Sequence, residues 1–289
     1  MAYTQKINRR KLKKTIILSV FKINTILTIS FLVIILGIII YYASDALSLN
    51  FFTKNWEHNN IEKGGIFPAI LGSLYISLGI ALLSFPIGIA SSIFTHEFNS
   101  IQVLSKIINF MTRLLTGIPS IIYGLFGLAI FVNLLNFGPS LGAAILTLSI
   151  MTLPWIIAAT NEALEDIPIE LKESSFALGA DRTTTLLNIT FPMAFPGMLT
   201  GLILGLSRSI GETAPIILVG ATFFLQKLPD SIFSKFLALP YHTFILATQH
   251  SDPKAINYAA ASALTLIVLI FIMNSLAFYL RYKFRKINN

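Results

Sequence analysis

Residues 195–221 read FPGMLTGLILGLSRSIGETAPIILVGA. This stretch is longer than the roughly 20 predominantly apolar residues that carry a helix across the hydrocarbon core of a membrane. It therefore predicts a membrane-spanning helix that contains one arginine, Arg208, and one glutamate, Glu212. A single charge near the bilayer centre costs roughly 2.5 to 3.5 kcal/mol on insertion scales. We therefore do not expect an unpaired Arg208 to face lipid, and the two charges need an explanation.

The composition of the whole chain agrees with a membrane protein. Of its 289 residues, 55% are hydrophobic and 12% are charged, and the mean hydropathy is +0.76. These values are too apolar for a soluble domain of this length. The net charge of +8 does not indicate nucleic-acid binding, because the basic residues crowd near the chain ends, at 9–14 and 281–286. The absence of cysteine excludes disulfides, a thiolate metal site and a cysteine nucleophile.

Apolar runs of helical length predict an all-α integral membrane protein with six transmembrane helices. The predicted spans lie near residues 22–43, 67–94, 114–136, 138–161, 195–221 and 257–280. If the N-terminus lies inside, most lysines and arginines fall in the segments on the inner side of the membrane. Because cytoplasmic segments carry an excess of these residues, we expect both termini in the cytoplasm.

The spans divide the chain into four segments. We expect a basic cytoplasmic tail over 1–21, a first transmembrane helix with its outer loop over 22–63, a core transmembrane domain over 64–282 and a second cytoplasmic tail over 283–289. The first apolar run is too long for the apolar region of a signal peptide, so we expect it to remain as a membrane anchor. The most charged internal segment is the cytoplasmic loop 162–194 of the core domain.

The cytoplasmic loop contains two short predicted helices. They cover 169–178 and 180–189; Gly179 separates them and Pro192 ends the second helix. The helical pattern alone does not say what the two helices contact. A loop that merely connects two spans at the membrane surface therefore remains an alternative.

A spacing in this loop resembles the EAA motif of bacterial ABC importer permeases. The pattern E-A-A-x3-G-x9-I-x-L-P is matched by Glu173, Ser174, Ser175, Gly179, Ile189 and Pro192, with serines in place of the two alanines and phenylalanine in place of the leucine. The resemblance implies that the loop docks in a groove of a cytoplasmic ATP-binding subunit. This is physically reasonable, because small side chains let a short helix seat closely and glycine allows a turn between two rigid pieces.

The charged pair in the fifth span has two explanations. Arg208 and Glu212 are four residues apart, which brings them onto one face of a helix and lets them pair. Such a pair can simply fix the packing of the helix. Alternatively it lies in a polar path, because several glycines together with Ser207 and Thr213 leave little bulk around it, and Pro215 predicts a kink beside it. An arginine in such a path suits an oxyanion, since its planar donors match two oxygens at once.

Four blocks of sequence resemble PstA-type permease subunits of bacterial phosphate ABC importers. They are GGIFPAILGSLY at 64–75, IPSIIYGLFGL at 118–128, GLSRSIGETAPI at 205–216 and LPYHTFILAT at 239–248. The resemblance implies a type I ABC importer permease in a bacterial cell membrane, with Arg208 and Glu212 involved in phosphate passage. The partners that it implies are a PstC-like permease, two ATP-binding subunits and an external phosphate-binding protein, besides membrane lipid.

The sequence carries no ATP site of its own. It contains no Gly-rich loop of the form GxxxxGK[ST], and His242, His250 and Asp252 in the outer loop lack the short spacing of a metal site. We therefore expect no catalytic residue, no metal and no cofactor in this chain, with ATP and magnesium bound by the partner subunits. A permease for sulfate or molybdate and, in another class, an ion-coupled secondary transporter remain as alternatives.

Overall fold

In the computed structural model, the chain is a bundle of helices. The structure describes residues 2–57, 60–97, 102–223, 225 and 228–287. In chain order the helices are α1 (Ala2–Ala43), α2 (Leu49–Thr53), α3 (Phe67–Glu97), α4 (Gln102–Thr116), α5 (Ser120–Gly127), η1 (Leu128–Leu134), α6 (Leu141–Glu165), α7 (Ile169–Ala177), α8 (Arg182–Thr185), η2 (Leu186–Thr190), α9 (Phe191–Ile210), α10 (Ala214–Val219), α11 (Leu239–Thr248) and α12 (Ala255–Ile287), where η marks π-helical turns. The described residues hold no β-strand beyond one isolated bridge, which confirms the predicted all-α class.

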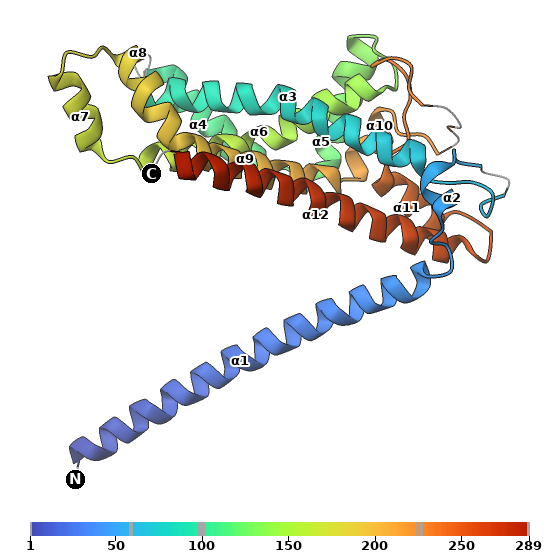
Figure 1. The fold of residues 1–289 in the computed structure, drawn as a ribbon, viewed down its shortest axis with the longest axis horizontal. Helices are drawn as coiled ribbons and strands as arrows, with labels where there is room; N and C mark the ends of the chain where they lie inside the picture. Colours follow the sequence, from blue (N-terminus) through green and yellow to red (C-terminus); the bar gives the residue numbers. More distant parts are fainter. Residues whose placement is uncertain (1, 58–59, 98–101, 224, 226–227, 288–289) are drawn as a thin grey trace.

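Five helices in the described part of the chain are long and apolar enough to cross a membrane. They are Lys14–Ala43, Phe67–Glu97, Leu141–Glu165, Arg182–Ile210 and Ala255–Phe284. A sixth span results if α4 is counted together with α5 and η1, across a bend of 112°. Helices α3, α6, α9 and α12 pack side by side, whereas α1 extends away from the bundle (Figure 1).

The third span is not the straight helix that was predicted over 114–136. Instead, α4 ends at Thr116, α5 begins at Ser120, and the chain turns sharply between them. Pro119 explains the break, because a proline lacks a backbone donor and disfavours helical geometry in the residue before it. The polar helix α4 therefore lies at an angle to α5 rather than in line with it.

The fifth span also differs from the single helix that was predicted over 195–221. Helix α9 ends at Ile210, a turn follows, and α10 carries Pro215 in its first turn. The kink that Pro215 predicted is thus a complete break in the helix. The break lies directly beside the charged pair, where it frees backbone groups from the helical ladder.

The prediction that Pro192 ends a helix is wrong. Segments α8, η2 and α9 follow one another without a gap, so that Arg182–Ile210 forms one helix. The π-turn η2 accommodates the proline, because Phe191 donates its N–H to the carbonyl of Leu186, five residues back. The loop after α6 therefore continues into the fifth span as one unbroken helix.

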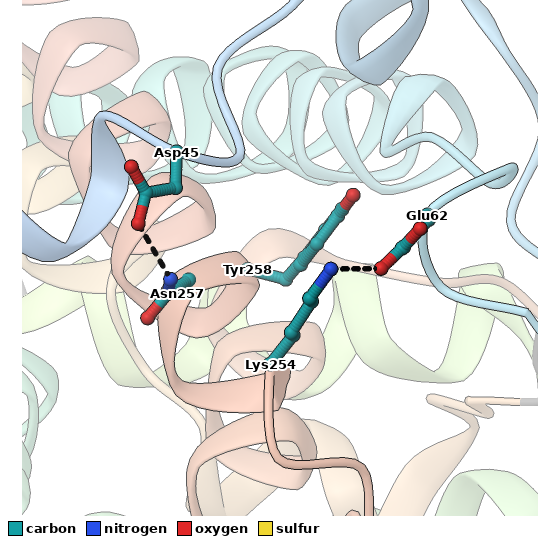
Figure 2. Close-up of a pocket in the computed structure, with 5 residues that line it drawn as sticks. All are labelled: Asp45, Glu62, Lys254, Asn257 and Tyr258. Atoms are coloured by element: carbon teal, nitrogen blue, oxygen red, sulfur yellow. Dashed lines mark hydrogen bonds and ion pairs between the residues drawn. The ribbon is translucent and has the colours of Figure 1, made fainter.

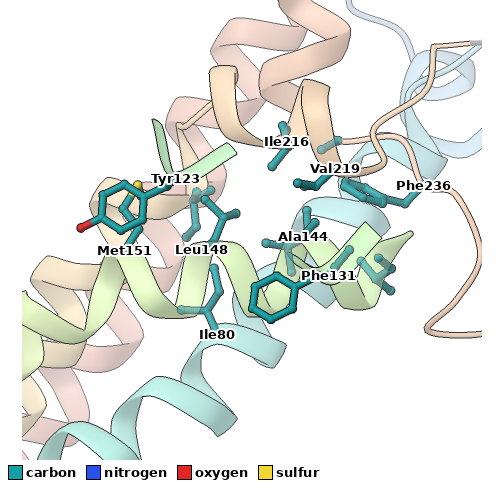
Figure 3. Packing of buried hydrophobic residues seen from close by; sticks show 14 of the residues in the cluster. Ile80, Tyr123, Phe131, Ala144, Leu148, Met151, Ile216, Val219 and Phe236 are labelled. Atoms are coloured by element: carbon teal, nitrogen blue, oxygen red, sulfur yellow. The ribbon is translucent and has the colours of Figure 1, made fainter. Parts of the chain in front are cut away.

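The main core of the bundle is built on α6. Its Leu148 and Met151 pack with Ile80 of α3, Tyr123 of α5 and Ile216 of α10 (Figure 3). Because lipid tails are as apolar as these side chains, close van der Waals contact rather than transfer out of water holds such helices together. Helix α6 is consequently the element against which α3, α5, α9 and α10 are placed.

Glycines bring α9 and α6 into direct contact. Gly197, Gly201 and Gly205 recur at every fourth residue of α9 and face α6. A Cβ atom at Gly201 would lie 2.8 Å from Cβ of Ala159, and one at Gly205 would lie 2.5 Å from Cγ2 of Thr152. These three glycines therefore serve helix packing, whereas a Cβ at Gly211, next to Glu212, would meet only the carbonyl oxygen of Arg208, at 4.0 Å.

We expect Gly205→Ala to destabilise the protein by about 1 to 3 kcal/mol, since the added methyl group overlaps Thr152. The thermal unfolding midpoint of the purified protein in detergent measures this effect. Gly37→Ala is the matched control, because no atom lies within 4 Å of a Cβ at that position. Equal midpoints for the two variants would contradict the close contact.

Candidate functional site

The charged pair lies at the point where α9 ends. Arg208 is in the last turn of α9, and Glu212 is in the turn that follows. The Nε atom of Arg208 is 3.9 Å from Oε1 of Glu212, which makes an ion pair but is too long for a hydrogen bond. The predicted pairing is present, and the two side chains are only loosely joined.

The two halves of the pair differ in exposure. The side chain of Arg208 is 46% exposed, whereas that of Glu212 is 17% exposed. Glu212 lines a small recess within the bundle, together with Ser73 of α3 and Pro240 of α11. The carboxylate is therefore sheltered, and the guanidinium is the accessible half of the pair.

A tryptophan on α6 supports the guanidinium. The Cζ atom of Arg208 lies 5.1 Å from the ring centroid of Trp155, within the range of a cation–π interaction. Trp155 itself is 36% exposed on the surface of the chain. The sequence analysis missed this residue, because one tryptophan in an apolar run gives no signal of its own. Arg208 and Trp155 together form a patch with an accessible cation on the surface of the bundle.

The two other predicted path residues do not form part of this patch. The hydroxyl group of Ser207 lies 2.7 Å from Oδ1 of Asn274, so it connects α9 with α12. Thr213 is the half-buried N-cap residue of α10, and its side chain makes no capping hydrogen bond. Of the four predicted residues, the structure thus brings the two charged ones together and gives Ser207 a contact between helices.

The loop between α6 and α9 projects from one end of the bundle (Figure 1). Helix α7 covers the first predicted helix, and the second begins with α8. Gly179 between them has φ of +86°, a left-handed conformation that favours glycine. The hydroxyl groups of Ser175 and Thr185 lie 2.9 Å apart and join the two helices. Hydrogen bonds from Thr184 to Asp181, the N-cap of α8, hold the pKa of Asp181 below its ordinary value.

The residues of the EAA-like pattern have unequal positions in this loop. Glu173 and Ser174 are exposed on α7, while Ser175 turns inward to α8. Ile189 and Pro192 lie in the continuous helix that leads into the fifth span. Beside the exposed serine, large apolar side chains are also open to the surface: Leu171 is 40% exposed, Phe176 45% and Leu178 90%. The loop therefore presents an apolar surface built around α7.

A partly buried ion pair ties α7 to the bundle. Lys172 is 7% exposed, and its Nζ atom pairs with Oε1 of Glu97 at the end of α3. The same carboxylate oxygen lies 3.3 Å from Nδ1 of His96. The sequence analysis missed this contact, because Lys172 and Glu97 are far apart in the chain and each reads as an ordinary charge in a loop or at a helix end.

A second polar recess lies at the opposite end of the bundle from α7 (Figures 1 and 2). Lys254 pairs there with Glu62, and Nδ2 of Asn257 donates to Oδ2 of Asp45 at 3.1 Å. Both contacts join the start of α12 to the connection between α1 and α3. Because the Lys254–Glu62 pair is largely exposed, it fixes this connection only weakly.

Residues 84–286 match the family described as the binding-protein-dependent transport system inner membrane component. The chain is 31% identical over 222 residues to the phosphate transport system permease protein PstA 1 of Mycobacterium tuberculosis (strain ATCC 25618 / H37Rv), which covers 76% of this chain and 70% of that protein. It is 29% identical over 262 residues to the phosphate transport system permease protein PstA of Haemophilus influenzae, which covers 90% and 91% of the two chains.

Solved structures of ABC importers share the fold. A structure of the MetNI methionine ABC transporter matches with a TM-score of 0.60 at 17% identity, over 76% of this chain and 94% of that chain. An importer of the polysaccharide alginate matches with a TM-score of 0.58 at 18% identity, over 75% and 79%. At these identities the likeness shows the fold alone. The family match over most of the chain shows that the chain belongs to the inner membrane components of binding-protein-dependent transport systems, as a multi-pass permease subunit of an ABC importer.

Proposed function

We propose that the chain is a permease subunit of an ATP-driven importer of inorganic phosphate, and that Arg208 contacts the anion as it passes. The observation that carries the proposal is the half-exposed arginine at the broken end of α9. The guanidinium of Arg208 lies over the ring of Trp155 and is only loosely paired with Glu212. The relatives named as phosphate transport permeases support the choice of phosphate.

The chemistry of Arg208 suits a tetrahedral oxyanion. Its planar guanidinium offers donors in a fixed fork that matches two oxygens of the anion. Because Glu212 already neutralises part of its charge, an arriving anion exchanges with the carboxylate instead of meeting a bare cation. Binding of this kind is weak enough to allow release, as transport requires.

Sulfate and molybdate are the rival substrates, since the guanidinium would also accept these tetrahedral oxyanions. The names of the relatives favour phosphate over both. The ion-coupled secondary transporter loses its support, because members of the family work in binding-protein-dependent systems.

The exposed face of Arg208 and Trp155 implies a second permease. A half-exposed arginine that faced lipid would be costly, so we place a PstC-like permease against this face, where the two subunits enclose the path. An external phosphate-binding protein delivers the anion at the end of the bundle opposite α7. The start of α1 and the end of α12 lie toward the same side of the structure as α7 and α8 (Figure 1). This arrangement supports a cytoplasmic position for both termini.

Coupling to ATP takes place through α7. Two ATP-binding subunits bind ATP and magnesium, and one of them docks on the apolar surface that Leu171, Phe176 and Leu178 form. The Lys172–Glu97 pair transmits movement of α7 to α3, because separating the two would leave the buried Lys172 without its partner. Closure of the ATP-binding subunits then rocks the two permeases and exposes Arg208 to each side of the membrane in turn.

We expect Arg208→Gln to lower ATP-driven uptake of labelled phosphate by about 10-fold or more, since a hydrogen bond to a charged group contributes about 1.5 to 3 kcal/mol. Uptake into vesicles that hold the reconstituted complex measures this. Arg281→Gln, at the other end of the bundle, is the matched control and should leave uptake unchanged. Unimpaired uptake by Arg208→Gln in an assembled complex would overturn the role of Arg208.

We expect Gly179→Val to abolish the stimulation of ATP hydrolysis by the loaded binding protein, because a β-branched residue rarely adopts φ of +86°. Gly179→Asn should retain most of the stimulation, since asparagine tolerates this conformation. Both variants should insert in the membrane normally. Full stimulation in Gly179→Val would show that the turn is not needed for docking.

We expect Lys172→Met and Glu97→Gln each to lower the amount of phosphate transported per ATP hydrolysed. If the two residues act as one link, the double variant should be no worse than the poorer single variant. Parallel measurement of uptake and ATP hydrolysis in the same vesicles gives this ratio. Additive losses, or an unchanged ratio in both single variants, would show that the pair does not couple α7 to α3.

A further inference from the structure

A polar cavity of about 320 Å³ lies on the α7 side of the charged pair, between α3, α4 and α6. Its lining is Thr95 and His96 from α3, Asn109, Thr112 and Arg113 from α4, and Ala158, Asn161 and Glu165 from α6. Arg113, Ala158 and Glu165 are exposed, so the cavity opens to the surface of the chain. No motif in the sequence groups these residues together.

The cavity begins one turn along α6 from the patch around Arg208. Trp155, which lies under the guanidinium, and Ala158, which lines the cavity, are exposed on successive turns of α6. Asn161 follows one turn later, which places it about 9 Å along the helix from Trp155 at 1.5 Å per residue. A small anion that leaves Arg208 along this face of α6 therefore reaches the cavity next.

The lining offers mainly hydrogen-bond donors. Arg113 provides a planar cation, His96 an imidazole, Asn109 and Asn161 amide groups, and the two threonines hydroxyl groups. A cationic fork surrounded by neutral donors is the arrangement that recognises oxyanions. The apolar contribution comes mainly from Ala158, so the cavity does not suit an apolar ligand.

We propose that this cavity is an inner binding site for the transported anion, occupied between release from Arg208 and escape toward the ATP-binding subunits. The inference rests on the proposed function for the identity of the anion as phosphate. The site lies in this chain alone, on α3, α4 and α6, and Arg113 is its cation. It gives the anion a second polar contact between Arg208 and the ATP-binding subunits.

Glu165 adds selectivity to the site. Its carboxylate partly cancels the charge of Arg113, which keeps the affinity for any anion low and favours release. A carboxylate can also accept a hydrogen bond from the hydroxyl group of HPO₄²⁻, whereas sulfate carries no proton at neutral pH and meets only repulsion. The site therefore binds phosphate in preference to sulfate. Glu165→Gln should reduce the difference in affinity between the two anions.

The cavity is also connected to the docking helix. His96 in its wall contacts the carboxylate of Glu97, and Glu97 pairs with the buried Lys172 of α7. Movement of α7 therefore acts on a wall of the cavity through two adjacent side chains. Through this contact, a movement of α7 that follows ATP binding acts directly on the site from which the anion leaves.

The absence of cysteine from the chain permits a direct test. In the complex reconstituted in lipid nanodiscs without ATP, A158C is labelled with a neutral maleimide, and the labelling rate is followed as phosphate, sulfate or molybdate is added. We expect millimolar phosphate to slow labelling several-fold, and the added substitution Arg113→Gln to remove this protection. K106C, on the same helix as Arg113 but outside the cavity, is the control. Its labelling rate should be the same with and without each anion.

The outcomes separate this inference from the proposed function. Protection by sulfate or molybdate but not by phosphate would uphold an inner oxyanion site and overturn phosphate as the substrate. No protection by any oxyanion, with phosphate uptake by the complex intact, would overturn the inner site alone. As a second measure, Arg113→Gln should lower phosphate uptake several-fold while Lys106→Gln does not; unimpaired uptake by Arg113→Gln would also count against the site.

Discussion

The absence of side chains at Gly197, Gly201 and Gly205 lets α9 lie directly against α6, and this contact places the functional groups of the chain. With the glycine face turned to α6, Arg208 falls at the edge of the contact, where its guanidinium rests over Trp155. Close packing of this kind is rigid, because no side chain can rearrange between the two backbones. The position of the cation is therefore set by helix packing and not by its own ion pair.

Breaks in the helices then leave the charged groups accessible at the surface of the bundle. The turn before Pro215 ends α9 immediately after Arg208, so the arginine lies at a helix end instead of within a buried span. The break at Pro119 turns α4 away from α5 and brings the polar face of α4 against α3 and α6. At the cytoplasmic end that we propose, Lys172 and Glu97 join the loop helix to α3. Arg208 and the polar face of α4 are thus joined along α6, where a partner permease would enclose them.

The sequence predicted the parts of this structure that depend on local pattern. Long apolar runs predicted the spans, Gly179 the turn in the loop, and the spacing of Arg208 and Glu212 their pairing. It failed at Pro192, because a π-turn shifts the hydrogen bonds there and lets the helix continue through the proline. Trp155 under Arg208, the Lys172–Glu97 pair and the cavity around Arg113 bring together residues from distant segments, and no local pattern in one sequence specifies such contacts.

The central claim is that phosphate passes this chain at Arg208 at the expense of ATP. The most direct test is the uptake of labelled phosphate into vesicles that hold the complete complex, with ATP inside the compartment that the ATP-binding subunits face and the binding protein on the other side. We expect uptake that requires both ATP and the binding protein and that an excess of unlabelled sulfate or molybdate does not reduce. Uptake of labelled sulfate or molybdate in place of phosphate, or phosphate uptake that persists without ATP, would contradict it.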